Sequence, residues 1–267
     1  MARTVPQAQH VERSQRRTVV EVLYPEFGNQ AGDNGNAMYL RACLPDAEFI
    51  DTPYGAEPAF ATRDDVSCIL LGNMTERQQE RVAAALAPHR DRLLQLADAG
   101  TPILFTGNAA ELLGRAIVAP DGTETPCLGI FDIVARQLMP TRITGTGLGT
   151  FRPDPTDPQA QPIDVVGFKM QFTQMDGDNS SCAFVKLKQG FGLRAEGNVP
   201  DTGFEGLRRN NLIGTWFLGP LLTINPPFTR WLLDAMGEQS ASLKDADIAQ
   251  RAYEQRVRDF ATPGMDV

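Results

Sequence analysis

The chain has 267 residues, of which 42% are hydrophobic and 22% charged, and this ordinary globular composition excludes a disordered, collagen-like or coiled-coil protein. Its 25 basic and 33 acidic residues give a formal net charge of −8, which disfavours nucleic acid as the main partner. The four cysteines are widely spaced and form no CxxC pair, so the sequence favours neither a zinc ribbon nor a disulfide framework. We therefore expect a reduced, cytoplasmic protein. No apolar run approaches the roughly 20 residues that a membrane helix needs.

The first half of the chain alternates short apolar runs with helical segments. Residues 1–17 predict a disordered, solvated tail, and residues 18–267 predict a single domain. Strands are expected over 18–25, 47–53, 65–72 and 101–107, and helices over 36–44, 75–100 and 108–114. Thr75 and Gln78 form a capping box at the start of the second helical stretch, and Pro88 marks a break within it. This alternation predicts a mostly parallel, doubly wound α/β sheet flanked by helices.

The second half of the chain has a different pattern. Asp121-Gly122 between two short apolar runs predicts a hairpin, and residues 140–225 predict antiparallel strands beside the parallel sheet. The GTGLG run at 145–149 does not match a nucleotide-binding loop and is interpreted as a flexible turn. Residues 152–162 are rich in proline and predict an exposed loop. Helices are expected over 228–236 and 245–260.

Sites in such a sheet lie beyond the carboxyl ends of the strands, here the loops 26–35, 72–75 and 106–109. The stretch PILFTGNAAELLG (102–114) predicts a strand that turns sharply into a helix, which places one residue at a helix N-terminus. A cysteine at such an elbow has a lowered pKa. The chain has two histidines, His10 in the tail and His89 in a polar PHRD segment, and both are expected to be solvated.

The order of these segments resembles the class-I (triad) glutamine amidotransferase family, and within it the GatD branch related to CobB and CobQ. The resemblance rests on LYPEFGNQAGDNGNAMYLR, LLGNMTERQQ, TPILFTGNAAELLG, PDGTETPCLGIFD, PTRITG, VVGF and NNLIGTWFLGPLL, and it covers roughly residues 18–236. It implies the amidotransferase fold. It also implies a protein partner, because GatD-type proteins supply ammonia to MurT, a Mur-ligase-like protein that amidates a peptidoglycan precursor.

The resemblance places the family's nucleophile and base on residues that cannot serve. The family's elbow reads like CGGxxxLG, and alignment with Leu113-Gly114 puts the cysteine position at Gly107. The family's late motif reads like GTYxHGP, and the histidine position is Leu218. A thiolate attacks the glutamine amide and the histidine moves its proton, so both functions are missing. No catalytic residue is therefore expected.

The remaining pocket positions are interpreted as vestigial or ligand-binding. They are Gly72 and Asn73 in the oxyanion loop, Thr106 and Asn108 beside the elbow, Gln171 after the GF pair, and Arg142, which matches a substrate-binding arginine in GatD. The run Trp216-Phe217-Leu218 is expected either to fill the empty pocket or to pack in the core. No metal and no cofactor are expected.

The main functional hypothesis is a catalytically silent GatD-like scaffold or regulatory subunit of an ATP-dependent amide ligase such as a Mur-ligase-like partner. One alternative is an active enzyme of the same fold, either a glutaminase subunit or one using Thr106, Asn108 or Glu111, with Arg142 as an anion clamp. Another is a small-molecule-binding or self-associating protein, a homo-oligomer without a ligase partner.

Overall fold

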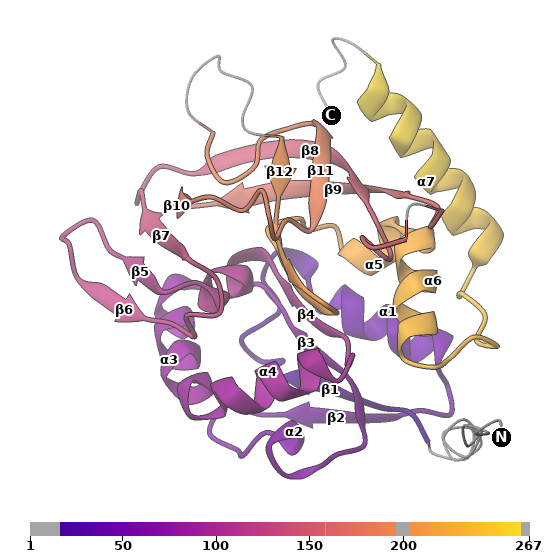
Figure 1. The fold of residues 1–267 in the computed structure, drawn as a ribbon, viewed down its shortest axis with the longest axis horizontal. Helices are drawn as coiled ribbons and strands as arrows, with labels where there is room; N and C mark the ends of the chain where they lie inside the picture. Colours follow the sequence, from indigo (N-terminus) through magenta and orange to yellow (C-terminus); the bar gives the residue numbers. More distant parts are fainter. Residues whose placement is uncertain (1–16, 158, 196–202, 263–267) are drawn as a thin grey trace, which may run out of the picture.

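A computed structural model describes residues 17–157, 159–195 and 203–262 (Figure 1). Its central element is a six-stranded sheet in the order β13-β14-β4-β3-β1-β2. Five strands are parallel and β13 pairs antiparallel at one edge. The strands are β1 (Val19–Leu23), β2 (Glu48–Thr52), β3 (Val66–Leu71), β4 (Ile103–Thr106), β13 (Leu207–Arg209) and β14 (Leu212–Thr215).

Helices cover both faces of this sheet, because its central strands are apolar on both sides (Figure 1). One face packs on α1 (Gly35–Cys43), α5 (Leu221–Ile224) and α6 (Pro226–Ala235). The other face packs on α3 (Glu76–Leu86) and α4 (Arg90–Asp98). Alternation along β3 shows the division, since Cys68 and Leu70 belong to the first core and Ile69 and Leu71 to the second.

Two four-stranded sheets from the second half of the chain accompany the parallel sheet (Figure 1). The first has the order β10-β7-β5-β6, and the second β12-β11-β8-β9. Their strands are β5 (Ala116–Val118), β6 (Glu124–Pro126), β7 (Ile133–Gln137), β8 (Ile143–Phe151), β9 (Ile163–Gln171), β10 (Thr173–Gly177), β11 (Val185–Gln189) and β12 (Phe204–Glu205). The helix α7 (Ala246–Ala261) packs on β8 and β9 through Phe260, Leu148 and Val166.

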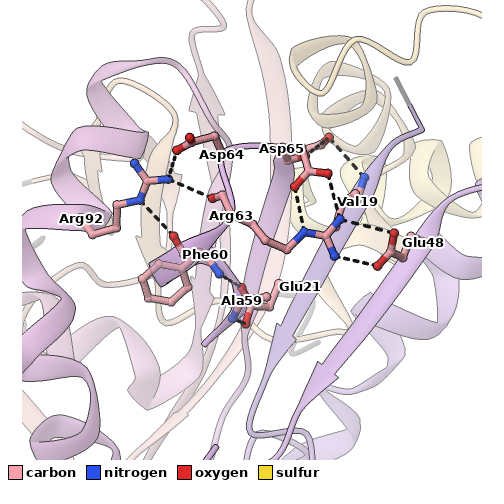
Figure 2. A network of polar contacts seen from close by, with 10 residues as sticks. Val19, Glu21, Glu48, Ala59, Phe60, Arg63, Asp64, Asp65 and Arg92 are labelled. Atoms are coloured by element: carbon pink, nitrogen blue, oxygen red, sulfur yellow. Dashed lines mark hydrogen bonds and ion pairs between the residues drawn. The ribbon is translucent and has the colours of Figure 1, made fainter. Parts of the chain in front are cut away.

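Glu21 in the middle of β1 is fully buried and fixes the segment that follows β2 (Figure 2). Its carboxylate accepts hydrogen bonds from Thr52 Oγ1 at 2.5 Å and from the backbone N–H groups of Ala59 and Phe60 at 2.6 and 2.7 Å. These two N–H groups begin the short helix α2 (Ala59–Thr62), so the carboxylate caps it.

The doubly wound α/β fold class predicted from the sequence is confirmed. The expected strands and helices up to residue 100 are present, the capping box of Thr75 and Gln78 forms, and Pro88 lies in a 3-10 turn, η3 (Ala87–His89), between α3 and α4. The hairpin at Asp121-Gly122 forms between β5 and β6. Residues 1–16 of the predicted tail, with His10, lie outside the described residues.

Several local expectations are wrong. The helix expected over 108–114 is a 3-10 helix, η4 (Gly107–Leu113). Gly114 ends it in an extended conformation with a φ of −75°, and a Cβ there would lie 2.8 Å from the carbonyl oxygen of Ile133, so close packing favours glycine. The GTGLG run is the interior of β8 and not a flexible turn. β14 was expected to be antiparallel but pairs parallel with β4.

The sequence also misplaced His89. Its side chain is only 15% exposed, and its ring packs edge-on against Phe60 with centroids 5.7 Å apart. The short helices α2 and α5 were not predicted, because each is a single turn without an apolar period of its own. Within the described ranges, no helix has both the length and the apolar character to cross a membrane.

Candidate functional site

Three loops meet at the carboxyl edge of the parallel sheet, after β1, β3 and β4. The loops after β1 and β3 touch through two glycines, because a Cβ on Gly72 would lie 2.1 Å from the carbonyl oxygen of Gly28. Only glycine permits this approach. The contact brings Asp33, from the end of the first loop, beside Asn73 and Thr106.

The elbow after β4 is closed by the side chain of Asn73. Gly107 has a φ of +62°, and a Cβ placed on it would lie 2.4 Å from Oδ1 of Asn73 and 2.6 Å from its Cβ and Cγ. The space in which a side chain at position 107 would begin is therefore already filled. The sequence assigns Gly107 as the vacant nucleophile position but gives no sign of this neighbour.

Asn73 and Asn108 bind the two loops together. The backbone N–H of Asn108 donates to Oδ1 of Asn73 at 2.9 Å. In return, Oδ1 of Asn108 accepts from the backbone N–H of Met74 at 2.9 Å, and its Nδ2 donates to the Met74 carbonyl at 2.8 Å. The backbone N–H of Asn73 donates to Oδ2 of Asp33 at 2.8 Å. The N–H groups of Asn73 and Met74 in the predicted oxyanion loop thus have side-chain acceptors.

Asp33 is a buried acid that was not predicted from the sequence. It is 2% exposed, and besides the Asn73 bond it accepts from Thr106 Oγ1 at 2.5 Å and Asn36 Nδ2 at 2.7 Å. Burial raises the pKa of Asp33 to about 6, although these three hydrogen bonds lower it. An acidic residue between glycines in the loop that follows a buried strand was the available signal.

A cavity of about 220 Å³ lies on the β9 side of the elbow. Its lining includes Asn73, Asn108, Arg142 and Gln171, four of the residues predicted for the pocket. The guanidinium of Arg142 lies 4.9 Å from the ring centroid of Phe172, and within the described part of the chain it forms no ion pair.

Gln171 lines this cavity and is buried. The side chain is 4% exposed, and its Nε2 donates to the carbonyl of Thr173 at 2.6 Å. Its Oε1 has no hydrogen-bond partner among the residues that the structure describes. The lining also includes a cation, Arg142, which suits a small ligand with an anionic group.

Glu111, from η4, also lines this cavity and is 1% exposed. Its carboxyl group interacts with Gln79 Nε2 at 2.8 Å, with the Thr173 hydroxyl, and with Trp216 Nε1 at 3.3 Å. Burial raises the pKa of Glu111 to about 7, against these hydrogen bonds. An acid with this pKa exchanges protons near neutral pH, so Glu111 differs from an ordinary helix residue.

Leu218, the position aligned with the family's histidine, lies outside the lining of this cavity. It is buried, and its backbone pairs with Phe168 through hydrogen bonds of 2.8 and 3.0 Å. Phe217 packs tightly on two glycines, since a Cβ on Gly167 would lie 2.4 Å from its ring. Of the run expected either to fill the pocket or to pack in the core, Trp216 and Phe217 both belong to the core, and Trp216 also donates to Glu111.

A second cavity, of about 190 Å³, lies on the α1 side of the same edge. Gly72 and Thr106 line it together with Asp33. Six of the predicted site residues are thus divided between two cavities, whereas Gly107 and Leu218 line neither. The four cysteines, all within the described ranges, are free and line neither cavity. Within those ranges no group of three or more His, Cys, Asp or Glu residues is arranged to hold a metal ion.

Comparison with known proteins agrees with this architecture. No protein-family model matches the chain. Among solved structures, one described as a glutamine amidotransferase aligns with a TM-score of 0.50 and 12% identity, covering 81% of this chain and 98% of that chain. The chain has the glutamine amidotransferase-like fold. PurLQS from Thermotoga maritima aligns with a TM-score of 0.49 at 12% identity, over 91% of this chain and 100% of that one.

A curated relative is similar to this chain in sequence. The GatD subunit of lipid II isoglutaminyl synthase (glutamine-hydrolyzing) from Staphylococcus aureus (strain N315) is 27% identical over 181 residues. The alignment covers 67% of this chain and 67% of that subunit. The GatD-like character expected from the sequence motifs is therefore supported.

Proposed function

We propose that this protein is a catalytically silent GatD-like subunit that stabilises or regulates an ATP-dependent amide ligase of the Mur-ligase-like class. The observation that carries the proposal is the closed elbow. Gly107 has no nucleophile, and the Asn73 side chain occupies the space where one would begin.

The groups that glutamine hydrolysis requires support a catalytically silent site. The reaction needs a thiol or hydroxyl nucleophile, a base to accept its proton, and N–H donors for the oxyanion. Position 107 lacks the first, and the buried Leu218 lacks the second. The N–H groups of Asn73 and Met74 are already bound to the side chains of Asp33 and Asn108. Loss of nucleophile and base together argues against one tolerated substitution.

The similarity to the GatD subunit supports a ligase partner for this protein. That relative's name makes it a subunit of a synthase, and it shares 67% of its length with this chain. We expect a silent subunit of this fold to keep its partner-binding surface although its own site does not react. We therefore expect this protein to bind a ligase and to act without releasing ammonia from glutamine.

Two experiments test the proposal. A tagged pull-down from the native host, analysed by mass spectrometry, is expected to recover a Mur-ligase-like or other ATP-dependent synthetase. The purified complex, given glutamine, is expected to release no ammonia above a buffer control. Ammonia release that survives removal of every cysteine would contradict a silent pocket, and a protein recovered alone would contradict the subunit role.

The pair formed by Thr106 and Asp33 favours a second candidate, an active enzyme of this fold with other chemistry. The sequence offered no base for Thr106, whereas in the folded chain Oδ2 of Asp33 lies 2.5 Å from its hydroxyl. This candidate predicts turnover that Thr106→Ala abolishes and Thr106→Ser retains. A metabolite that remains bound through purification would identify the substrate, and equal turnover in both variants would reject Thr106 as the nucleophile.

A further inference from the structure

The cavity on the α1 side lies at the topological switch point of the sheet. β1 stands between β2 and β3, and the chain leaves β1 toward β2 before it crosses back to β3. Open α/β sheets bind ligands in the crevice at the carboxyl ends of the strands at such a point. The cavity has this position, since it lies against α1 and is lined by Val22, Leu70 and Leu104 from β1, β3 and β4.

The lining of this cavity combines apolar strand side chains with two acids, Asp33 and Asp51. The side chains of Val22, Leu70 and Leu104 all belong to the core cluster on the α1 face. Asp33 supplies the carboxyl group, and Asn36 and Thr106 are its neighbours in the lining. A ligand that fits must therefore combine an apolar body with a group that a carboxylate binds.

The Asp33 carboxylate keeps one acceptor position. A carboxylate has about four acceptor positions. Oδ2 uses two, for Thr106 and the Asn73 N–H, whereas Oδ1 accepts only from Asn36. Asp33 lines the cavity, so we expect the unused position on Oδ1 to be within reach of a donor bound there.

This carboxylate also lacks a cation. In the described ranges no lysine, arginine or histidine forms an ion pair with Asp33. The basic residue at the cavity, Arg41, is bound to Asp51 at 2.6 Å and lies over the ring of Phe49. A buried carboxylate without a cation is costly, and a bound cation would offset that cost.

We infer that this cavity binds a small primary amine, whose ammonium group donates to Oδ1 of Asp33 while its alkyl or aryl body lies against Val22, Leu70 and Leu104. Cavities of about 150 Å³ hold a benzene-sized molecule, so a cavity of about 190 Å³ fits roughly six to eight non-hydrogen atoms. The site is separate from the elbow cavity, so the inference does not depend on the proposed subunit role.

The test uses the full-length protein and matched probes. Benzylamine, benzyl alcohol and benzoate differ in their polar group but share the ring, and n-butylamine and 1-butanol form a second pair. Calorimetry and ligand-observed NMR are expected to show at least tenfold tighter binding of each amine than of its alcohol, and no binding of benzoate. Equal binding of amine and alcohol, or no amine binding at tens of millimolar, would overturn the inference.

Variants locate the site. Asp33→Asn is expected to weaken amine binding at least tenfold and to leave alcohol binding unchanged. Asp132→Asn, which removes an equally charged but exposed carboxylate, controls for net charge and is expected to change neither. If Asp33→Asn does not fold, Ala37→Leu narrows the cavity from α1 with Asp33 intact, and it is expected to abolish amine binding. Amine binding that persists in Ala37→Leu would also overturn the inference.

Discussion

Replacing Gly107 by alanine tests whether Asn73 closes the elbow. The new Cβ would lie 2.4 Å from Oδ1 and 2.6 Å from Cγ of Asn73, distances that no packed side chain tolerates. Asn73 must therefore move, and the backbone N–H of Asn108, now bound to Oδ1 at 2.9 Å, loses its acceptor. The perturbation thus combines backbone strain with a broken buried hydrogen bond.

The magnitude follows from these two terms. A non-glycine residue at a φ of +62° costs about 1–2 kcal/mol. A buried donor left without an acceptor costs about 1–3 kcal/mol. Gly107→Ala is therefore expected to lower the free energy of unfolding by about 2–5 kcal/mol, measured by urea denaturation with circular dichroism.

Two comparisons separate the terms. Gly122 has a φ of +88° and no atom within 4 Å of the point that an alanine Cβ would occupy, so Gly122→Ala measures backbone strain alone and is expected to cost about 1–2 kcal/mol. In an Asn73→Gly background the steric conflict is absent, and Gly107→Ala is expected to cost at least about 1 kcal/mol less than in the natural chain. If Gly107→Ala costs no more than Gly122→Ala, or the same in both backgrounds, the closed elbow is refuted.

Three further predictions concern buried acids. Burial raises the pKa of Asp33 from 3.8 to about 6, so folding disfavours its ionisation. The free energy of unfolding is therefore expected to fall by about 3 kcal/mol as pH rises from about 4 to above 6. Urea denaturation of Asp33→Asn at several pH values is expected to show no such fall. Glu111, with a pKa of about 7 against 4.5, is expected to give a similar slope between pH 4.5 and 7, which Glu111→Gln removes. Glu21→Gln places a donor against the N–H groups of α2 and is expected to cost about 2–3 kcal/mol, with faster hydrogen exchange at Ala59 and Phe60.

A specific result would contradict each of these three predictions. An unchanged pH slope in Asp33→Asn would mean that this carboxyl group is not desolvated as the structure implies, and the same holds separately for Glu111. Retained exchange protection at Ala59 in Glu21→Gln would mean that α2 does not depend on the carboxylate cap. The exposed variant Asp132→Asn serves as a common control, since it is expected to change stability by less than about 0.5 kcal/mol.

The parallel core is well predicted from the sequence because the signals for its strands and helices lie within a few residues of one another. The apolar run ending at Leu71 and the capping box at Thr75 each fix an element within a few residues. The pairing of β14 with β4 was not local. β14 joins a strand more than 100 residues earlier, and its short apolar run is equally compatible with either direction of pairing.

The site was predicted in part for the same reason. The elbow at Gly107 is readable because strand, glycine and helix follow one another in the chain. The bond between Asp33 and Thr106 joins residues 73 positions apart, and the filling of the elbow by Asn73 depends on the contact between two loops. Neither leaves a periodic signal, so only the folded arrangement shows them.

Buried carboxyl groups with raised pKa values gather at the carboxyl edge of the parallel sheet. Among the described residues, the carboxyl groups whose pKa is raised are Asp33, Glu111 and Glu205. Each is hydrogen-bonded at the carboxyl edge, to the ends of β4 or β14 or to the residue after β14. Such groups reduce stability at neutral pH and are typical of functional sites. Because buried carboxyl groups with raised pKa values gather where ligands bind, we expect this edge of the sheet to bind a ligand.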